Sequence, residues 1–81
     1  MSKMSKHAFD FLLLLLEQYE KSGKLKTRFY SFDYPDVIAP DFSIDELAKR
    51  GYIIKEGNIA DSILLTELAI SELENIKQQH S

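Results

Sequence analysis

The chain has 81 residues, of which 44% are hydrophobic and 28% charged, with a formal net charge of −3 and no cysteine. This length predicts one small domain with a modest core, which association with a second copy could enlarge. The lack of cysteine excludes disulfides and thiolate metal sites and fits a cytoplasmic protein. The leucine run Leu12–Leu16 is too short to span a membrane, so we expect no membrane partner.

Charge is distributed unevenly along the chain. Residues 1–32 contain six Lys or Arg and three acidic residues, whereas residues 33–81 contain four Lys or Arg and ten acidic residues. The first part is therefore basic and the second part acidic, which bears on any partner that carries charge of its own.

The first predicted helix covers Lys6–Lys21, with Ser5 as its candidate cap and Ser22-Gly23 as its end. A stripe at helical spacing should face the core and consists of Ala8, Leu12, Leu15, Leu16 and Tyr19. Further apolar residues widen the arc beyond what one surface needs, so it is either wrapped by its own domain or shared with a second subunit. A dimer interface would use Phe9, Phe11, Leu13 and Leu14.

Residues 24–32 are rich in β-forming side chains and predict an extended segment that can supply an edge strand. A basic cluster lies here, either as a solvated strand edge or as a phosphate contact, and contains Lys21, Lys24, Lys26 and Arg28. Asp33–Pro40 predicts one short helix or a pair of turns, because Pro40 disfavours the helical conformation at Ala39.

Residues 42–74 predict a short helix, a hairpin and a second helix. Ser43 and Glu46 have the spacing of a capping box, and Phe42 could pack on Leu47 as a hydrophobic staple. Gly51 suits a left-handed cap at the end of this helix, which is expected over Ile44–Arg50. Its inward residues would be Ile44, Leu47 and Ala48.

The hairpin can form with a short or a long loop. A two-residue loop at Gly57-Asn58 would set Ile54 opposite Asp61. A loop over Glu56–Asp61 instead sets Ile54 opposite Ile63, and such apolar pairs stabilise a sheet by about 0.2–1 kcal/mol each. We therefore predict the longer loop.

The longer loop also sets Tyr52 opposite Leu65. Thr66 then caps a last helix that ends near Gln78. The inward residues of this part would be Leu65, Leu68, Ala69, Leu73 and Ile76.

Catalytic chemistry is poorly represented in the sequence. The two histidines, His7 and His80, lie near opposite ends, and neither has a metal-ligand partner four residues on. Without cysteine, the common nucleophile–base arrangements would need one of them. The three glycines are isolated, so no phosphate-binding loop is indicated. We expect a protein that is not an enzyme and that uses no cofactor or metal.

The run Leu47–Ile53, an acidic loop, Leu65-Thr66-Glu67 and Leu73 together resemble the winged-helix pattern of MarR-like and PadR-like regulators. The resemblance covers about residues 42–74, and Ala69 stands where the family usually has glycine. It implies an α+β fold, a single winged-helix-like domain over residues 1–81. The expected parts are a long N-terminal helix, short helices, a two- or three-stranded antiparallel wing and a C-terminal helix.

The resemblance implies a transcriptional regulator that binds double-stranded DNA, as a homodimer, through the helix Ile44–Arg50 and the wing Lys55–Asp61. The cations available to DNA phosphates would be Lys24, Lys26, Arg28, Lys49, Arg50 and Lys55. Asp45 and Glu46 would repel phosphates at the turn where bases are usually contacted, and DNA affinity depends on phosphate neutralisation.

The alternative is a winged-helix module that binds another protein and not DNA. Its acidic second half and wide apolar first helix favour this reading. The distribution of positive charge distinguishes the two: a continuous positive strip around Lys49 and Arg50 favours DNA, whereas scattered cations favour a protein partner.

Overall fold

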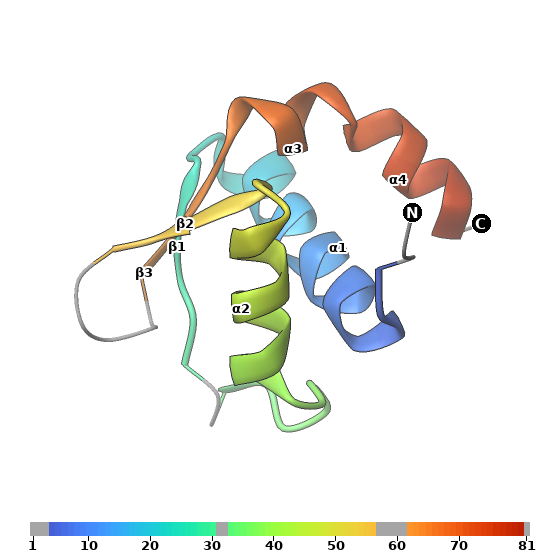
Figure 1. Ribbon diagram of the computed structural model, residues 1–81. Coiled ribbons are helices and arrows are strands. Elements are labelled where there is room, and N and C mark those ends of the chain that lie inside the picture. The colour runs from blue at the N-terminus through green and yellow to red at the C-terminus, as the bar shows by residue number, and fades with distance from the viewer. Residues whose placement is uncertain (1–3, 31–32, 57–61, 81) are drawn as a thin grey trace.

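The computed structural model describes residues 4–30, 33–56 and 62–80. Its elements in chain order are α1 (Lys6–Ser22), β1 (Lys26–Arg28), α2 (Pro40–Lys49), β2 (Ile53–Lys55), β3 (Ser62–Leu65), α3 (Glu67–Ser71) and α4 (Leu73–His80) (Figure 1). The sheet lies beside α2, and α3 and α4 run across one end of the fold (Figure 1). The predicted α+β class, long first helix, antiparallel sheet and C-terminal helix are confirmed.

Helix α1 is the centre of the core. Its buried residues are Ala8, Phe11, Leu12, Leu15 and Leu16. The helix contacts α2, β1 and α4, so its wide apolar arc is covered on several sides by its own domain. It ends as predicted at Gly23, which has a φ of 73° and donates its N–H to the Tyr19 carbonyl at 2.7 Å. No helix within the described ranges has the length and apolar content that crossing a membrane requires.

Helix α2 begins earlier than the capping-box prediction. Its first residue is Pro40, whose fixed φ suits that position, and Ala39 precedes it in the left-handed region with a φ of 49°. Ser43 therefore lies inside the helix, fully buried, and caps nothing. The staple is also wrong, because the Phe42 side chain is 73% exposed.

The other end of α2 is capped as predicted. Gly51 has a φ of 86° and donates its N–H to the Ala48 carbonyl at 3.1 Å. Tyr52 donates its N–H to the Leu47 carbonyl at 3.0 Å, which completes the Schellman pattern. Ile44 and Leu47 are buried, whereas Ala48 is only half-buried.

The sheet has three antiparallel strands in the order β1-β3-β2. Its hairpin register is one residue away from the predicted one. Ile53 lies opposite Leu65, Ile54 opposite Leu64 and Lys55 opposite Ile63, so the predicted pairs Ile54–Ile63 and Tyr52–Leu65 do not form. This register buries Ile53 and Leu65 together in the core and leaves Ile54 on the outer face.

The two-residue loop is excluded by the same register, because it would set Ile54 opposite Asp61 and not Leu64. The loop tip itself, with Gly57-Asn58, lies outside the described residues.

The C-terminal helix is divided in two. Thr66 caps α3, since its Oγ1 accepts from the Ala69 N–H at 3.4 Å. Helix α3 ends at Ser71, and α4 starts at Leu73 after Glu72, which was predicted to lie within one continuous helix. Of the residues expected inward, Leu65, Ala69 and Ile76 are buried, Leu73 is half-buried and Leu68 is 43% exposed.

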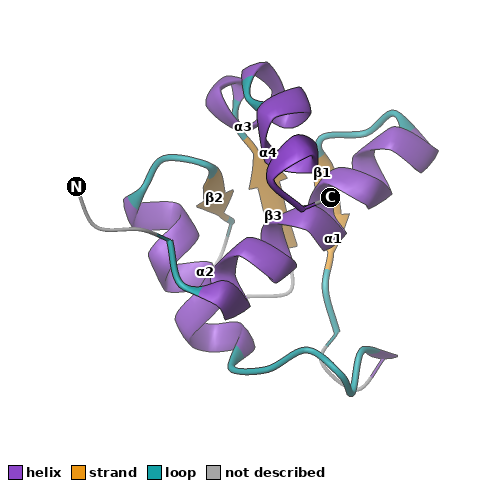
Figure 2. Cartoon of the chain, turned by 90° about the vertical axis from the view of Figure 1, so that its right-hand side faces the viewer, coloured by secondary structure: helices purple, strands orange, loops and turns teal. Residues whose placement is uncertain are grey.

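In its described part, the segment between β1 and α2 has a 3₁₀ conformation at Asp33, drawn as a short helical piece in Figure 2, and a turn at residues 35–36, but no α-helix. Asp33 donates its N–H to the Tyr30 carbonyl at 2.9 Å, and Val37 donates to the Tyr34 carbonyl at 3.1 Å. The Tyr34 ring stacks on Phe29 at 5.4 Å, which anchors the segment to the core. Of the two predicted possibilities, the pair of turns is therefore the one found.

Candidate functional site

The outer face of α2 pairs its cations with its own acids. Lys49 Nζ lies 3.1 Å from Asp45 Oδ2, and Arg50 Nε lies 3.3 Å from Glu46 Oε2. Both pairs have the i, i+4 spacing that joins side chains on one helical face. The helix that would enter a DNA groove therefore offers cations that are already neutralised by its own carboxylates.

The other four predicted DNA contacts are spread over the sheet. Lys24 and Arg28 are exposed at or beside β1, and Lys55 is exposed on β2, at the opposite edge. Lys26 Nζ lies 3.3 Å from Glu56 Oε1. No acid in the described ranges forms an ion pair with Lys24, Arg28 or Lys55.

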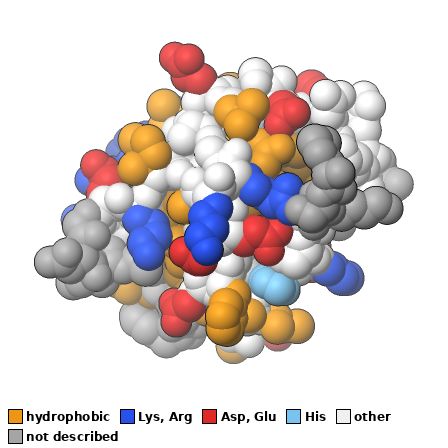
Figure 3. Space-filling model, in the orientation of Figure 1, with side chains coloured by type: hydrophobic (Ala, Val, Ile, Leu, Met, Phe, Trp, Pro, Cys, Tyr) orange, Lys and Arg blue, Asp and Glu red, His pale blue; other side chains and the backbone are white. Residues whose placement is uncertain are grey.

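Three of the six predicted cations thus lie beside a carboxylate, and the other three lie at or beside the two edge strands of the sheet. On the face that carries α2, Asp and Glu side chains lie directly beside the Lys and Arg side chains (Figure 3).

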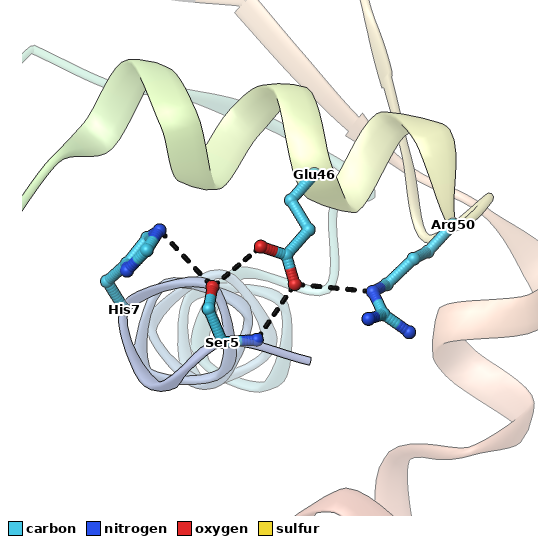
Figure 4. A network of polar contacts seen from close by, with 4 residues as sticks. All are labelled: Ser5, His7, Glu46 and Arg50. Atoms are coloured by element: carbon cyan, nitrogen blue, oxygen red, sulfur yellow. Dashed lines mark hydrogen bonds and ion pairs between the residues drawn. The ribbon is translucent and has the colours of Figure 1, made fainter. Parts of the chain in front are cut away.

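A polar network ties the start of α1 to α2 (Figure 4). Ser5 donates its N–H to Glu46 Oε2 at 2.8 Å and its hydroxyl to Glu46 Oε1 at 2.6 Å. The Ser5 hydroxyl also lies 3.2 Å from His7 Nε2. The two hydrogen bonds from Ser5, followed by the charge of Arg50, lower the pKa of Glu46 below its ordinary value.

This network was not expected from the sequence. Ser5 stands at the cap position of α1 but makes no side-chain cap bond there, because its hydroxyl is used by Glu46. The two residues are 41 positions apart, so no local pattern connects them. The arrangement does not resemble a hydrolytic triad, since the Ser5 proton is directed at a carboxylate and not at His7.

An apolar groove of about 550 Å³ opens between the first half of α1 and the turn segment before α2. Its apolar lining consists of Phe11, Leu14, Tyr34, Pro35, Val37 and Ile38. Its charged or titratable lining consists of Lys6, His7, Asp10, Asp33 and Asp36. The groove was not predicted from the sequence. The one available signal was that residues 33–40 combine Asp and Pro with the aliphatic residues Val37 and Ile38 in a stretch too short to bury them.

Two large hydrophobic side chains next to the groove are far more exposed than any others described. Ile38 is 74% exposed and Phe42 is 73% exposed, whereas the next value is 52% at Ile54. Ile38 belongs to the groove lining, whereas Phe42 lies on the first turn of α2 and borders a second hollow that shares His7 with the groove.

The predicted dimer residues of α1 lie in different environments. Phe11 is 1% exposed and packs against Phe29 with the ring centroids 4.8 Å apart, which leaves it no surface for a second subunit. Phe9, Leu13 and Leu14 are half-buried against the same core. Only a part of the proposed interface is thus accessible.

Comparison with models of protein families, with curated proteins and with solved structures gave no match to this chain. Among the described residues, no group of three or more His, Asp or Glu side chains could hold a metal ion.

Proposed function

We propose that this chain is a winged-helix-like interaction module whose partner is another protein and not duplex DNA. The succession of helix, strand, helix and β-hairpin, with the strand order β1-β3-β2, supports the winged-helix assignment. The division into turns where such a domain would have its second helix supports a use other than reading a DNA groove.

The observation that carries this proposal is the charge of α2. From Pro40 to Arg50 the chain has three acids, Asp41, Asp45 and Glu46, and two cations, Lys49 and Arg50, each cation within 3.3 Å of a carboxylate. Binding to DNA gains most of its affinity from neutralising phosphates, and on this helix the phosphates would compete with Asp45 and Glu46 for both cations. A protein partner imposes no such requirement.

The test is a titration of the protein into a labelled duplex of mixed sequence at low salt, followed by fluorescence anisotropy. We expect no binding in the tens-of-micromolar range, and no change when salt is raised. The double variant Asp45→Asn/Glu46→Gln removes the two carboxylates that pair with Lys49 and Arg50 and should gain measurable, salt-sensitive affinity, which shows that the assay detects DNA binding by this surface.

Wild-type binding that falls steeply with salt would overturn the proposal. That outcome would support the second candidate, a winged-helix transcriptional regulator. One observation favours it: Lys24, Arg28 and Lys55 are exposed without an ion pair to a described acid. The triple variant Lys24→Gln/Arg28→Gln/Lys55→Gln should then abolish the binding.

Homodimerisation is part of this second candidate, since winged-helix regulators place two readers on one duplex. Sedimentation equilibrium would measure it. Leu13→Glu is the matched change at the accessible part of the α1 surface, and a dimer that uses this surface should dissociate in that variant.

A further inference from the structure

We infer that the groove between α1 and the turn segment binds a cationic, amphipathic segment of a partner protein. This inference rests on the proposed function and specifies where the partner docks and what chemistry it has. We call the surface formed by the groove together with Ile38 and Phe42 the docking surface.

The size and lining of the groove suit apolar side chains. About 550 Å³ lies within the range of specific ligand sites, which are mostly apolar with a few charged groups at fixed positions. Leu14 forms the accessible side contributed by α1, with the buried Phe11 beneath it, and Tyr34, Val37 and Ile38 form the opposite side. More than one aliphatic side chain of a partner can enter together.

The groove is held open by the core. Phe11 packs on Phe29 at 4.8 Å, and Phe29 stacks on Tyr34 at 5.4 Å, so one aromatic row supports both sides. On the side opposite α1, the backbone turn is closed by the hydrogen bond from the Val37 N–H to the Tyr34 carbonyl. Little ordering is needed on binding, which preserves affinity.

The exposed side chains enlarge the apolar area that a partner can cover. Ile38 is 74% exposed on the rim of the groove and Phe42 is 73% exposed one turn further along the chain, so both side chains are available to a partner. An amphipathic helix could place one apolar residue per turn along this surface.

The charge around the docking surface determines which partner fits. Asp33, Asp36 and Asp41 are exposed and form no ion pair with a described cation, while Asp10 is paired with Lys6 at 3.0 Å. These free carboxylates favour Lys or Arg beside the apolar residues of the partner and repel phosphates of nucleic acid or anionic lipid. A symmetric pair of this chain would set the same acids against each other, so a second copy fits less well.

The experiment uses a labelled peptide of roughly 18 residues with leucine at helical i, i+3, i+4 and i+7 spacing and lysine elsewhere. Two further peptides serve as references: one with glutamate in place of lysine, and one with the leucines and lysines scrambled. Binding to the full chain is measured by anisotropy. We expect saturable binding of the patterned lysine peptide only.

Variants then locate the site. Asp33→Asn/Asp36→Asn and, separately, Ile38→Ser should each weaken the lysine peptide by about tenfold, the effect of losing about 1.4 kcal/mol. Glu17→Gln/Glu74→Gln removes the same charge outside the groove, and Ile54→Ser removes an exposed aliphatic side chain elsewhere. Both controls should bind like the wild type. All changed side chains are exposed, so folding should be retained, as circular dichroism can verify.

Equal weakening by the controls, or equal binding of the glutamate or scrambled peptide, would overturn the inference. So would a complete lack of lysine-peptide binding, or self-association of the chain that Ile38→Ser abolishes, which would make a second copy the occupant. None of these results changes the DNA titration, so the docking surface can fail while the protein-binding proposal stands.

Discussion

The two ends of helix α2 differ in how the chain enters and leaves the helix. At its C-terminal end a glycine takes the left-handed conformation, at Gly51, and the chain enters a buried strand. At its N-terminal end a left-handed alanine, Ala39, precedes Pro40, no side chain caps the helix, and Phe42 is exposed.

The difference separates parts that serve the fold from parts that serve something else. Every feature of the C-terminal end lowers the free energy of the folded state, in agreement with local sequence preference. The N-terminal end combines a strained non-glycine conformation with exposed apolar surface, and each of these costs stability or solubility. Such departures from local rules are expected at binding sites, and this end forms part of the docking surface.

The largest expected effect contrasts two hydrophobic residues of α2. Leu47→Ala should lower the free energy of unfolding by about 2–5 kcal/mol, because Leu47 is fully buried and its loss leaves a cavity. Phe42→Ala should change it by less than about 0.5 kcal/mol, since the ring is already in water. Urea denaturation measures both. If Phe42→Ala were as damaging as Leu47→Ala, the N-terminal end would be structural and the contrast would disappear.

The next prediction exchanges the two left-handed residues. Gly51→Ala should destabilise by about 1–2 kcal/mol, because a β-carbon at a φ of 86° is strained. Its new β-carbon would meet only Leu68 Cδ2, at 3.6 Å, so the cost is conformational and not a clash. Ala39→Gly relieves the same kind of strain at a φ of 49° but raises the conformational entropy of the unfolded chain. It should therefore stabilise the fold by less than about 1 kcal/mol. The opposite signs are the diagnostic result; destabilisation by both would mean that Ala39 is not strained.

These contrasts also explain what could be predicted from the sequence. Gly23, Gly51 and Thr66 end or begin helices through bonds within five residues, and each was predicted at its correct place. The start of α2 was predicted at the wrong place. Ser43 and Glu46 have the spacing of a capping box, but Glu46 is bound by Ser5 near the N-terminus, a contact that no local pattern indicates.

The hairpin register failed for a related reason. Cross-strand pairing of Ile54 with Ile63 is locally favourable, but only the position of the core decides which face of β2 is buried, and the core is built by α1. The groove likewise depends on α1 lying against a segment some 25 residues later in the sequence, so its lining could not be assembled from spacing alone.

The third prediction concerns the middle of α2. Ser43→Ala should raise the free energy of unfolding by about 1 kcal/mol, because the Ser43 Oγ is buried without a hydrogen-bond partner among the described residues and alanine is the better helix former. The matched control is Ser71→Ala, an exposed serine whose hydroxyl donates to the Leu68 carbonyl at 2.9 Å, where no gain is expected. Thermal and urea denaturation of both variants provide the comparison. A loss of stability in Ser43→Ala would show that its hydroxyl has a structural partner.

The smallest expected effect tests whether Glu46, near the C-terminal end of α2, ties this helix to the start of α1. The pKa of this carboxyl is lowered in the folded state by the hydroxyl and N–H of Ser5 and then by Arg50, so its ionised form stabilises the fold. This stability is fully present above the unfolded value near 4.5 and is lost as pH falls through the lower folded value. Glu46→Gln should therefore be less stable than the wild type near pH 7, by less than about 1 kcal/mol because the pair is partly exposed, and the difference should shrink below about pH 4.

Ser5→Ala should show a smaller change of the same kind, since it removes the 2.6 Å bond to Glu46 but keeps the bond from the Ser5 N–H at 2.8 Å. Asp45→Asn is the control, because it breaks only the exposed pair with Lys49 and should leave this pH dependence unchanged. Urea midpoints measured from pH 3 to 7 would show this, and parallel curves for wild type and Glu46→Gln would mean that the start of α1 is not tied to α2 by this carboxylate.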